Sequence, residues 1–236
     1  MRMAVSIALW CLLFVVSSTG CNRERFGRRS HVLRPQGEPE ILLMDFTRPF
    51  SLEPLAPGWY HYEFFWHEPM HIEFVTKNDV PAIKLSTRNS ASMLIRHVAI
   101  DLTDYPWLSW QWYVEQPIES PVDEKTKKGD DHPARLFLLF ETGAGESRPM
   151  EIIWGNTLEG GQYKYIDGFA HYVARGGNQH IKQWFTENVN LLEVYRTIWS
   201  DQEPVTLTEI GLFCDSDDTD TASVSYFAKV LMKKGH

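Results

Sequence analysis

Short apolar segments separated by turn-forming residues run along most of the chain. They are rich in aromatic and β-branched residues and are bounded by proline, glycine and asparagine, a pattern typical of strands. In 107–116, Leu108, Trp110 and Trp112 fall on one face and more polar residues on the other, which predicts a half-buried strand. We predict strands in 41–46, 59–66, 71–77, 81–87, 92–102, 107–116, 135–141, 150–156, 171–175, 208–215 and 222–232.

Only one segment has helical periodicity. Residues 188–199 place Val189, Leu192 and Tyr195 on one apolar stripe, which predicts a short helix. Many strand-like segments without alternating helices indicate an all-β fold, a sandwich or barrel rather than a parallel sheet. The polar run 118–131 has strand-like segments on both sides, so we interpret it as a loop within one domain.

The first twenty residues have the pattern of an export signal. Arg2 precedes an apolar run, 4–16, that is short for a membrane span, and small residues follow it. The run leads to SSTGC, which resembles the lipobox of bacterial lipoproteins, in which the cysteine becomes the lipidated first residue. We therefore predict a signal peptide over 1–20 and lipidation of Cys21. Cleavage of an ordinary signal peptide nearby is the alternative.

The segment after Cys21 lacks apolar periodicity. Residues 22–40 carry five arginines against three glutamates, a composition that predicts a lipidated N-terminus and a disordered basic tether over 21–40. Such a tether would add attraction to anionic head groups, at about 1 kcal/mol per arginine near the surface. The alternative is that the arginines only flank the export signal. The remainder, 41–236, has the length and pattern of a single β-sandwich domain.

Charge and cysteine content narrow the function. The formal net charge is −8 at pH 7, so the chain lacks the basic balance that nucleic-acid binding demands. Of the 3 cysteines, Cys11 lies in the predicted signal and Cys21 at its cut, which leaves Cys214. One cysteine cannot form an internal disulfide, so the exported domain must rely on its core, and the apolar segment around Cys214 indicates a buried thiol.

A polar cluster precedes a strongly apolar strand. Asp130 and Asp131 lie just upstream of Arg135, which begins the segment RLFLLFE. Both faces of that segment are apolar, so we expect a central strand covered on both sides, with a guanidinium at its end that needs a partner. Two interpretations stay open: a bidentate arginine–carboxylate clamp at the rim of the sheet, or the polar centre of a ligand site.

A second acidic segment, CDSDDTDT, stands between two predicted strands. Asp215, Asp217 and Asp218 offer carboxylates in a tight loop, which suits calcium, a hard cation that prefers oxygen ligands. The loop lacks the glycine and the closing glutamate of an EF-hand. We expect a weak calcium site there, and a solvated hairpin turn is the alternative.

Tryptophan is abundant downstream of the predicted signal, and exposed indole rings suit the C–H faces of sugars. Trp112 and Trp154 are our candidates for such platforms, although core filling is the alternative, and for Trp112 the aliphatic neighbours on its face favour it. No catalytic residue is predicted. We find no nucleophile elbow and no phosphate-binding loop, and Pro69 forbids the helix that would bring His67 and His71 onto one zinc ion.

Several segments together resemble a bacterial family, domain of unknown function 3047: LSWQWYV, GDDHPARLFLLFE, IIWG, WFTENVNLLEVYRTIW, IGLFCDSDDT and SYFAKVLM. The similarity runs from about residue 41 to 232, and its most specific residues are Asp130, Asp131, Arg135, Asp215, Asp217 and Thr219. This sequence departs from the family pattern at Asp218, where asparagine is usual, and over 193–196. The resemblance implies a fold and a site but no activity. The overall plan also resembles carbohydrate-binding jelly rolls, so we predict an antiparallel β-sandwich of the jelly-roll or galactose-binding-like kind.

We therefore predict an exported lipoprotein, lipid-anchored in the bacterial cell envelope, whose sandwich domain binds a polar ligand such as an envelope glycan. The ligand-binding candidates are Asp130, Asp131, Arg135, Trp112 and Trp154. Two alternatives are kept: a polysaccharide lyase or hydrolase that uses the acidic cleft, and a non-catalytic structural envelope protein. The expected partners are a glycan and the membrane, with calcium as the candidate cofactor and nucleic acid excluded.

Overall fold

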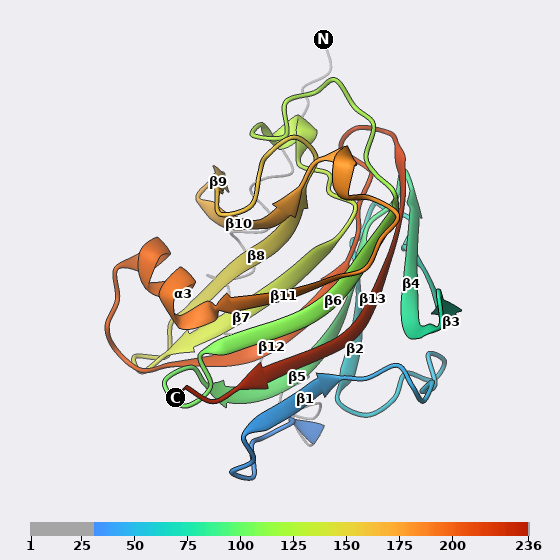
Figure 1. Ribbon diagram of the computed structural model, residues 1–236. Helices are drawn as coiled ribbons and strands as arrows, with labels where there is room; N and C mark the ends of the chain where they lie inside the picture. Colours follow the sequence, from blue (N-terminus) through green and yellow to red (C-terminus); the bar gives the residue numbers. More distant parts are fainter. Residues whose placement is uncertain (1–30, 236) are drawn as a thin grey trace.

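The protein folds into two packed β-sheets, as a computed structural model that describes residues 31–235 shows (Figure 1). One sheet has six strands in the order β11–β6–β13–β4–β3, with β1 paired to β13; the other has seven, in the order β2–β5–β12–β7–β8–β10–β9. The strands are β1 (Glu40–Met44), β2 (Trp59–Glu63), β3 (His71–Lys77), β4 (Val80–Arg88), β5 (Ser92–Asp101), β6 (Trp107–Gln116), β7 (Arg135–Thr142), β8 (Ser147–Gly155), β9 (Tyr163–Ile166), β10 (Phe169–Gly176), β11 (Phe185–Asn190), β12 (Val205–Phe213) and β13 (Ala222–Lys233). The predicted all-β jelly-roll sandwich is confirmed.

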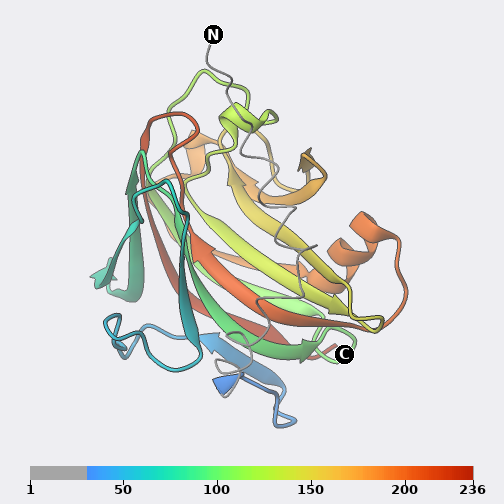
Figure 2. The same ribbon diagram turned by 180° about the vertical axis from the view of Figure 1, so that it is seen from behind.

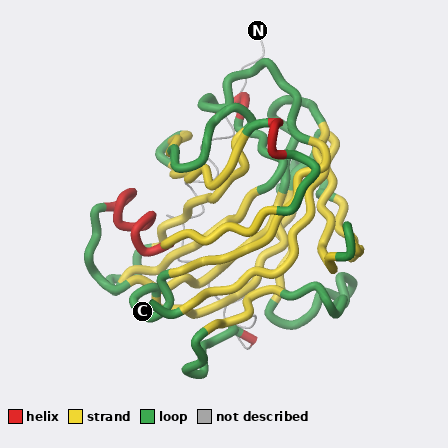
Figure 3. Tube along the Cα trace, in the orientation of Figure 1, coloured by secondary structure: helices red, strands yellow, loops and turns green. Residues whose placement is uncertain are grey.

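Nearly every strand pair is antiparallel; β8 and β10 form the one parallel pair between the named strands. Strand β13 is the central strand of the six-stranded sheet. It pairs with β6 along one edge and with both β4 and β1 along the other. The first and last strands of the sheet are thereby joined, with Ile41 opposite Met232. Strands dominate the trace in Figure 3.

The core lies between the sheets, and strand β7 shows how the sequence builds it. Leu136, Leu138 and Phe140 are fully buried between the sheets, whereas Phe137 and Leu139 on the opposite face are half-buried. Strand β7 is central, between β12 and β8, as predicted. Its two faces differ in burial, so the cover on the outer face is looser than the apolar sequence led us to expect.

Two predicted elements end elsewhere than expected. The helix α3 (Leu191–Trp199) begins three residues later than predicted, because Asn190 caps it by accepting a hydrogen bond from the Glu193 N–H, and the preceding residues belong to β11. Strand β2 stops at Glu63, three residues short of the predicted end. No described helix is both long and apolar enough to cross a bilayer.

The described part of the predicted tether is attached to the domain. Leu33 donates its N–H to the His97 carbonyl (3.1 Å), and its own carbonyl accepts from Ala99 N–H (2.9 Å). The carbonyl of Pro39 accepts from the N–H of Lys234 (3.0 Å). The prediction of disorder is therefore wrong for residues 31–40, where backbone pairing replaces water; residues 21–30, Cys21 and the signal lie outside the described residues.

Candidate functional site

Arg135 is the centre of a buried ion cluster at the start of β7. Its guanidinium is 2 % exposed; Nε donates to Asp215 Oδ1 (2.9 Å), Nη1 to Glu151 Oε2 (2.6 Å), and Nη2 lies 2.8 Å from Asp215 Oδ2. Nη2 also donates to the carbonyl oxygen of Asp130. Burial disfavours the charge, but the carboxylates of Asp215, Glu151 and Asp130 outweigh it and raise the pKa of Arg135 well above its usual value. The arrangement is that of a clamp, one of the two predicted interpretations.

Lys164 on β9 extends this cluster. Its ammonium donates to Asp130 Oδ1 (2.5 Å) and to the carbonyl of Glu124 (2.7 Å), and it lies 2.7 Å from His132 Nε2. Burial lowers the pKa of Lys164 and, together with the charge of Lys164, lowers the pKa of His132 well below its usual value. Burial alone would raise the pKa of Asp130, but Arg135 and its other cationic neighbours lower it overall, so this carboxylate stays charged.

The carboxylate of Asp131 holds the acidic loop between β12 and β13. It is fully buried, and Oδ1 accepts from Asp218 N–H (3.2 Å) while Oδ2 accepts from Thr219 N–H (2.7 Å) and from the Thr219 hydroxyl. Two segments 87 residues apart are thus joined by one side chain. Asp131 acts on the fold of the loop, and its oxygens face protein donors rather than solvent.

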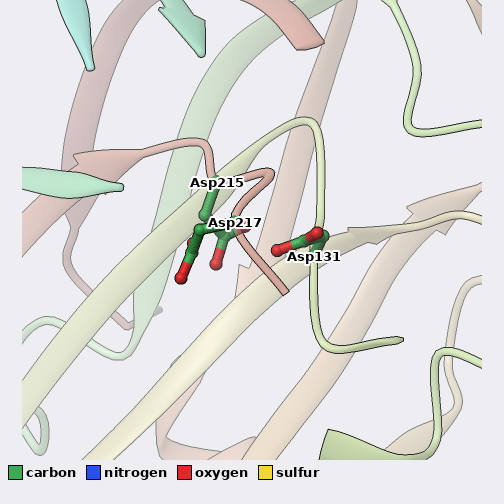
Figure 4. A group of neighbouring side chains, drawn as sticks. All are labelled: Asp131, Asp215 and Asp217. Carbon is green, nitrogen blue, oxygen red and sulfur yellow. The ribbon is translucent and has the colours of Figure 1, made fainter. Parts of the chain in front are cut away.

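Three carboxylates converge at this loop: Asp131, Asp215 and Asp217 (Figure 4). One ligand atom from each lies within 4.8 Å of the others. The metal-site prediction therefore needs a correction: Asp218 stands outside this group, and Asp131 takes its place. Asp131 and Asp215 already accept several internal hydrogen bonds, whereas the ion-pair partner of Asp217 among the described residues is His67, with Nδ1 at 3.2 Å. The carboxylate oxygens of these three residues are ligands of the kind that a hard cation prefers. Asp217 keeps most of its capacity to bind one, because few of its lone pairs accept hydrogen bonds.

Trp112 and Trp154 are core residues, not ligand platforms. Their exposures are 0 % and 1 %, and their rings lie edge-on to each other at 5.4 Å. The ligand-binding prediction for these rings is wrong, because both side chains point between the sheets. The indole N–H of Trp112 nevertheless donates to Glu187 Oε1 (3.1 Å), so this ring positions a charged group nearer the edge of the sandwich.

A polar groove of about 370 Å³ lies beside the acidic loop. Its floor is a row across four strands of the six-stranded sheet, on the face away from the core: His71 pairs with Ser86, Ser86 with Val224, and Val224 with Gln116. The groove is lined by Glu68, Pro69, His71, Ser86, Thr87, Arg88, Ser90, Gln116, Ala222 and Val224. Carboxylate, guanidinium, imidazole, amide and hydroxyl groups therefore share one hollow, which can donate and accept hydrogen bonds.

An exposed aromatic pair lies in the chain segment that leads to Glu68 and Pro69, two residues that line the groove. Phe65 and Trp66 are 85 % and 80 % exposed, with ring centroids 4.4 Å apart at 81°. Strand β2 ends at Glu63, and a turn in which His67 N–H donates to the Phe64 carbonyl (3.1 Å) carries both rings outward. Sequence reasoning missed this pair because it placed both residues in a strand. The available signal was Pro69, which marks the end of extended pairing.

The buried cluster braces the walls of the groove. Asp215 forms a bridge with Ala91, whose N–H donates to the Glu68 carbonyl (3.0 Å), and Asp217 contacts His67. In Figures 1 and 2 the loop between β12 and β13 and the segment after β2 lie at the same end of the molecule, opposite the first described residues. The clamp at Arg135 thus fixes the acidic loop, and the acidic loop fixes the rim of the groove.

Comparison with known proteins gives one family and several distant folds. The model of the family described as "Protein of unknown function (DUF3047)" matches residues 57–231, and no curated protein matches the chain. Similar solved structures include endoglucanase cel12A from Rhodothermus marinus (TM-score 0.42, 8 % identity, 75 % of this chain and 92 % of that chain) and the xyloglucanase domain of NopAA from Sinorhizobium fredii (0.38, 7 %, 76 % and 97 %). A third is the mannan-recognising carbohydrate-binding module TmCBM27 (0.35, 12 %, 84 % and 100 %). At these scores the likenesses assign neither a ligand nor an activity.

Proposed function

Because the chain belongs to the DUF3047 family, whose description names no activity, we propose from its own geometry that the domain binds a glycan in the groove beside Phe65 and Trp66. The observation that carries the proposal is this exposed aromatic pair in the same chain segment as Glu68 and Pro69, which line the groove. Contiguous exposed apolar surface, unlike single scattered side chains, marks interaction sites. Sugars present C–H faces to an aromatic ring and hydroxyls to polar groups, so one ligand satisfies both halves of the site.

The lining of the groove suits hydroxyl groups. Glu68 accepts hydrogen bonds, Arg88 donates them, and Gln116, Ser86 and Ser90 do both. A volume of about 370 Å³ is within the range of small-ligand sites, roughly 300–1,000 Å³. A chain of sugars would lie with one ring against Trp66 and the next in the groove.

The location remains part of the proposal. The signal-like residues 1–20 and the SSTGC segment support export and lipidation at Cys21, which would make an envelope glycan the available ligand. The loop between β12 and β13 and the segment after β2, which flank the groove, lie at the end of the domain opposite the first described residues (Figure 2), so an anchor attached near those residues would orient the groove away from the membrane.

We propose that the domain binds its glycan without cleaving it, and that the acidic cluster is not a catalytic site. The carboxylates of Asp131 and Asp215 are buried and accept hydrogen bonds from His132, Thr219 and Arg135. A lyase or hydrolase needs carboxylates that reach the scissile bond. These two carboxylates instead hold loops in place.

Glycan binding is tested on an array of muropeptides, lipopolysaccharide core oligosaccharides and neutral plant and bacterial oligosaccharides, with the mature chain as the probe. The hit is then titrated calorimetrically against Trp66→Ala. We expect at least a tenfold loss of affinity, since stacking on an aromatic ring contributes about 1–3 kcal/mol where bases stack, and a sugar face is a comparable partner.

The matched control is Trp107→Ala, the same change at a half-exposed tryptophan at the other end of β6. Its affinity should equal that of the wild type. An array without hits, or equal losses in both variants, contradicts the proposal.

A further inference from the structure

An ion pair joins the two sheets at one open edge of the sandwich. Arg175 comes from β10 of the seven-stranded sheet and Glu187 from β11 of the six-stranded sheet, with Nε 2.5 Å and Nη2 3.3 Å from the two carboxylate oxygens. Both are only partly buried, with side-chain exposures of 23 % and 12 %. The indole of buried Trp112 donates to Glu187, and the Arg175 guanidinium lies 3.6 Å from the ring centroid of Phe185. The pair is therefore held in one orientation.

Aromatic side chains continue from this pair along β10 and β9. Tyr172 is paired with Tyr163, their ring centroids are 5.2 Å apart, and both are half-buried. A bulge between Val173 and Arg175 puts Tyr172 opposite Ile152 and Arg175 opposite Trp154, so both side chains face the core side of their sheet. Burial raises the pKa of Tyr172, as do the charges of Tyr163 and Glu187. Phe185 is likewise half-buried. We call Tyr163, Tyr172, Arg175, Phe185 and Glu187 the inter-sheet site.

The geometry points to a second ligand site here, and we propose that the inter-sheet site binds a neutral saccharide chain. The charges of Arg175 and Glu187 cancel, so the site has no net charge to attract an ion. The guanidinium of Arg175 keeps free N–H donors, and the carboxylate of Glu187 keeps free acceptor positions, for the hydroxyls of a sugar. The phenol groups of Tyr163 and Tyr172 can each donate and accept one further hydrogen bond. Half-exposed rings of tyrosine and phenylalanine give the C–H faces of sugars a surface.

A purely structural role explains the site less well. Strand β11 is at the edge of its sheet, and β10 lies next to the edge strand β9. A partly exposed ion pair contributes only about 0–1 kcal/mol to stability, so it would hold the two sheets together weakly. At this edge of the core, strands β9, β10 and β11 carry the Arg175–Glu187 ion pair together with three aromatic rings, those of Tyr163, Tyr172 and Phe185. That composition is typical of a ligand site with a few placed polar groups among aromatic ones.

The inter-sheet site is separate from the groove. Trp112, which orients Glu187, points to the core side of the six-stranded sheet, whereas the groove residue Gln116 lies on the opposite face. The inference extends the proposed glycan binding to a second site and rests on it only for the ligand class. Variants can therefore silence each site alone.

The test uses the mature chain with the groove silenced by Trp66→Ala, titrated calorimetrically with cellohexaose, mannohexaose and xylohexaose. At least one hexasaccharide should bind. Adding Tyr172→Ala should weaken that binding at least tenfold, whereas Tyr172→Phe, which keeps the ring, should weaken it less than threefold. Glu187→Gln should weaken it at least tenfold as well. Thermal melting of each variant separates loss of binding from loss of fold, and Tyr172→Ala, half-exposed in the wild type, is the variant that stays folded.

Two outcomes overturn the inference: no hexasaccharide binds the Trp66→Ala chain, or Tyr172→Ala binds as tightly as its parent. If no hexasaccharide binds the Trp66→Ala chain but one binds the wild type, the inter-sheet site is excluded and the groove proposal is unaffected. Wild-type binding that survives Trp66→Ala but is lost with Tyr172→Ala would instead remove the groove and keep the inter-sheet site. The two proposals thus fail in different experiments.

Discussion

Replacing Arg135 by glutamine tests whether the buried cluster is a clamp. The change removes the partner of Asp215 and Glu151, which are both buried and contact the guanidinium at 2.6–2.9 Å. Breaking a buried pair from one side costs about 3–5 kcal/mol, because the remaining charge is left without compensation. With a urea m-value of about 2 kcal/mol per M, the unfolding midpoint should fall by about 1.5–2.5 M. Tryptophan fluorescence follows this unfolding, since Trp112 and Trp154 are in the core.

Arg88→Gln is the matched variant, because Arg88 is exposed and lines the groove. Its free energy of unfolding should change by less than about 0.5 kcal/mol, as for most surface changes. Affinity for the array hit should be lost with Arg88→Gln, although its stability is unchanged. A loss of stability below about 1 kcal/mol for Arg135→Gln would refute the clamp.

Three further predictions concern the acidic loop and the anchor. Burial and the charges of Asp217 and Asp131 raise the pKa of Asp218 from 3.8 to about 6, so its ionisation destabilises the folded chain as the pH rises through that range. Asp218→Asn, which removes this ionisable group, should raise the melting temperature at pH 8, and the gain should vanish below about pH 4; a constant gain would contradict this cause. Excess calcium should raise the melting temperature relative to chelator by mass action, and Asp217→Asn should remove the shift; superimposable curves would make the loop a turn only. Mass spectrometry should find acyl chains on Cys21 and soluble protein after Cys21→Ser, and an unmodified N-terminus elsewhere would exclude a lipoprotein.

The sequence pattern predicted those features of the fold and the site that depend on a single strand or loop. The apolar run after Arg135 predicted a central strand. The charge at its start predicted that Arg135 needs a partner, because burying an unpaired guanidinium is costly, and a clamp was one of the two interpretations left open. The partners Glu151 and Lys164 were not predicted, since their positions depend on the register of β7 with β8 and of β10 with β9. Register is a property of the assembled sheet, and it leaves little trace within a single segment.

Exposure of aromatic residues was the other failure. Alternation in 107–116 correctly favoured the core for Trp112, yet Trp112 and Trp154 were kept as ligand candidates because of their residue type alone. Phe65 and Trp66 have the same strand-like composition as their neighbours, and only the turn after β2 exposes them. Residue type indicates that an aromatic platform can exist, whereas backbone geometry decides which ring becomes one.

The position of β13 has a consequence for biogenesis. Among the described strands β13 is the last in sequence, yet β1, β4 and β6 all pair with it, with Glu40 opposite Lys233. Contacts between residues so far apart in sequence make folding slow, because the chain loses the entropy of loop closure before the strand pairing can stabilise it. The six-stranded sheet therefore cannot be completed before β13 has been synthesised, and a truncation before β13 would leave three strands with open edges.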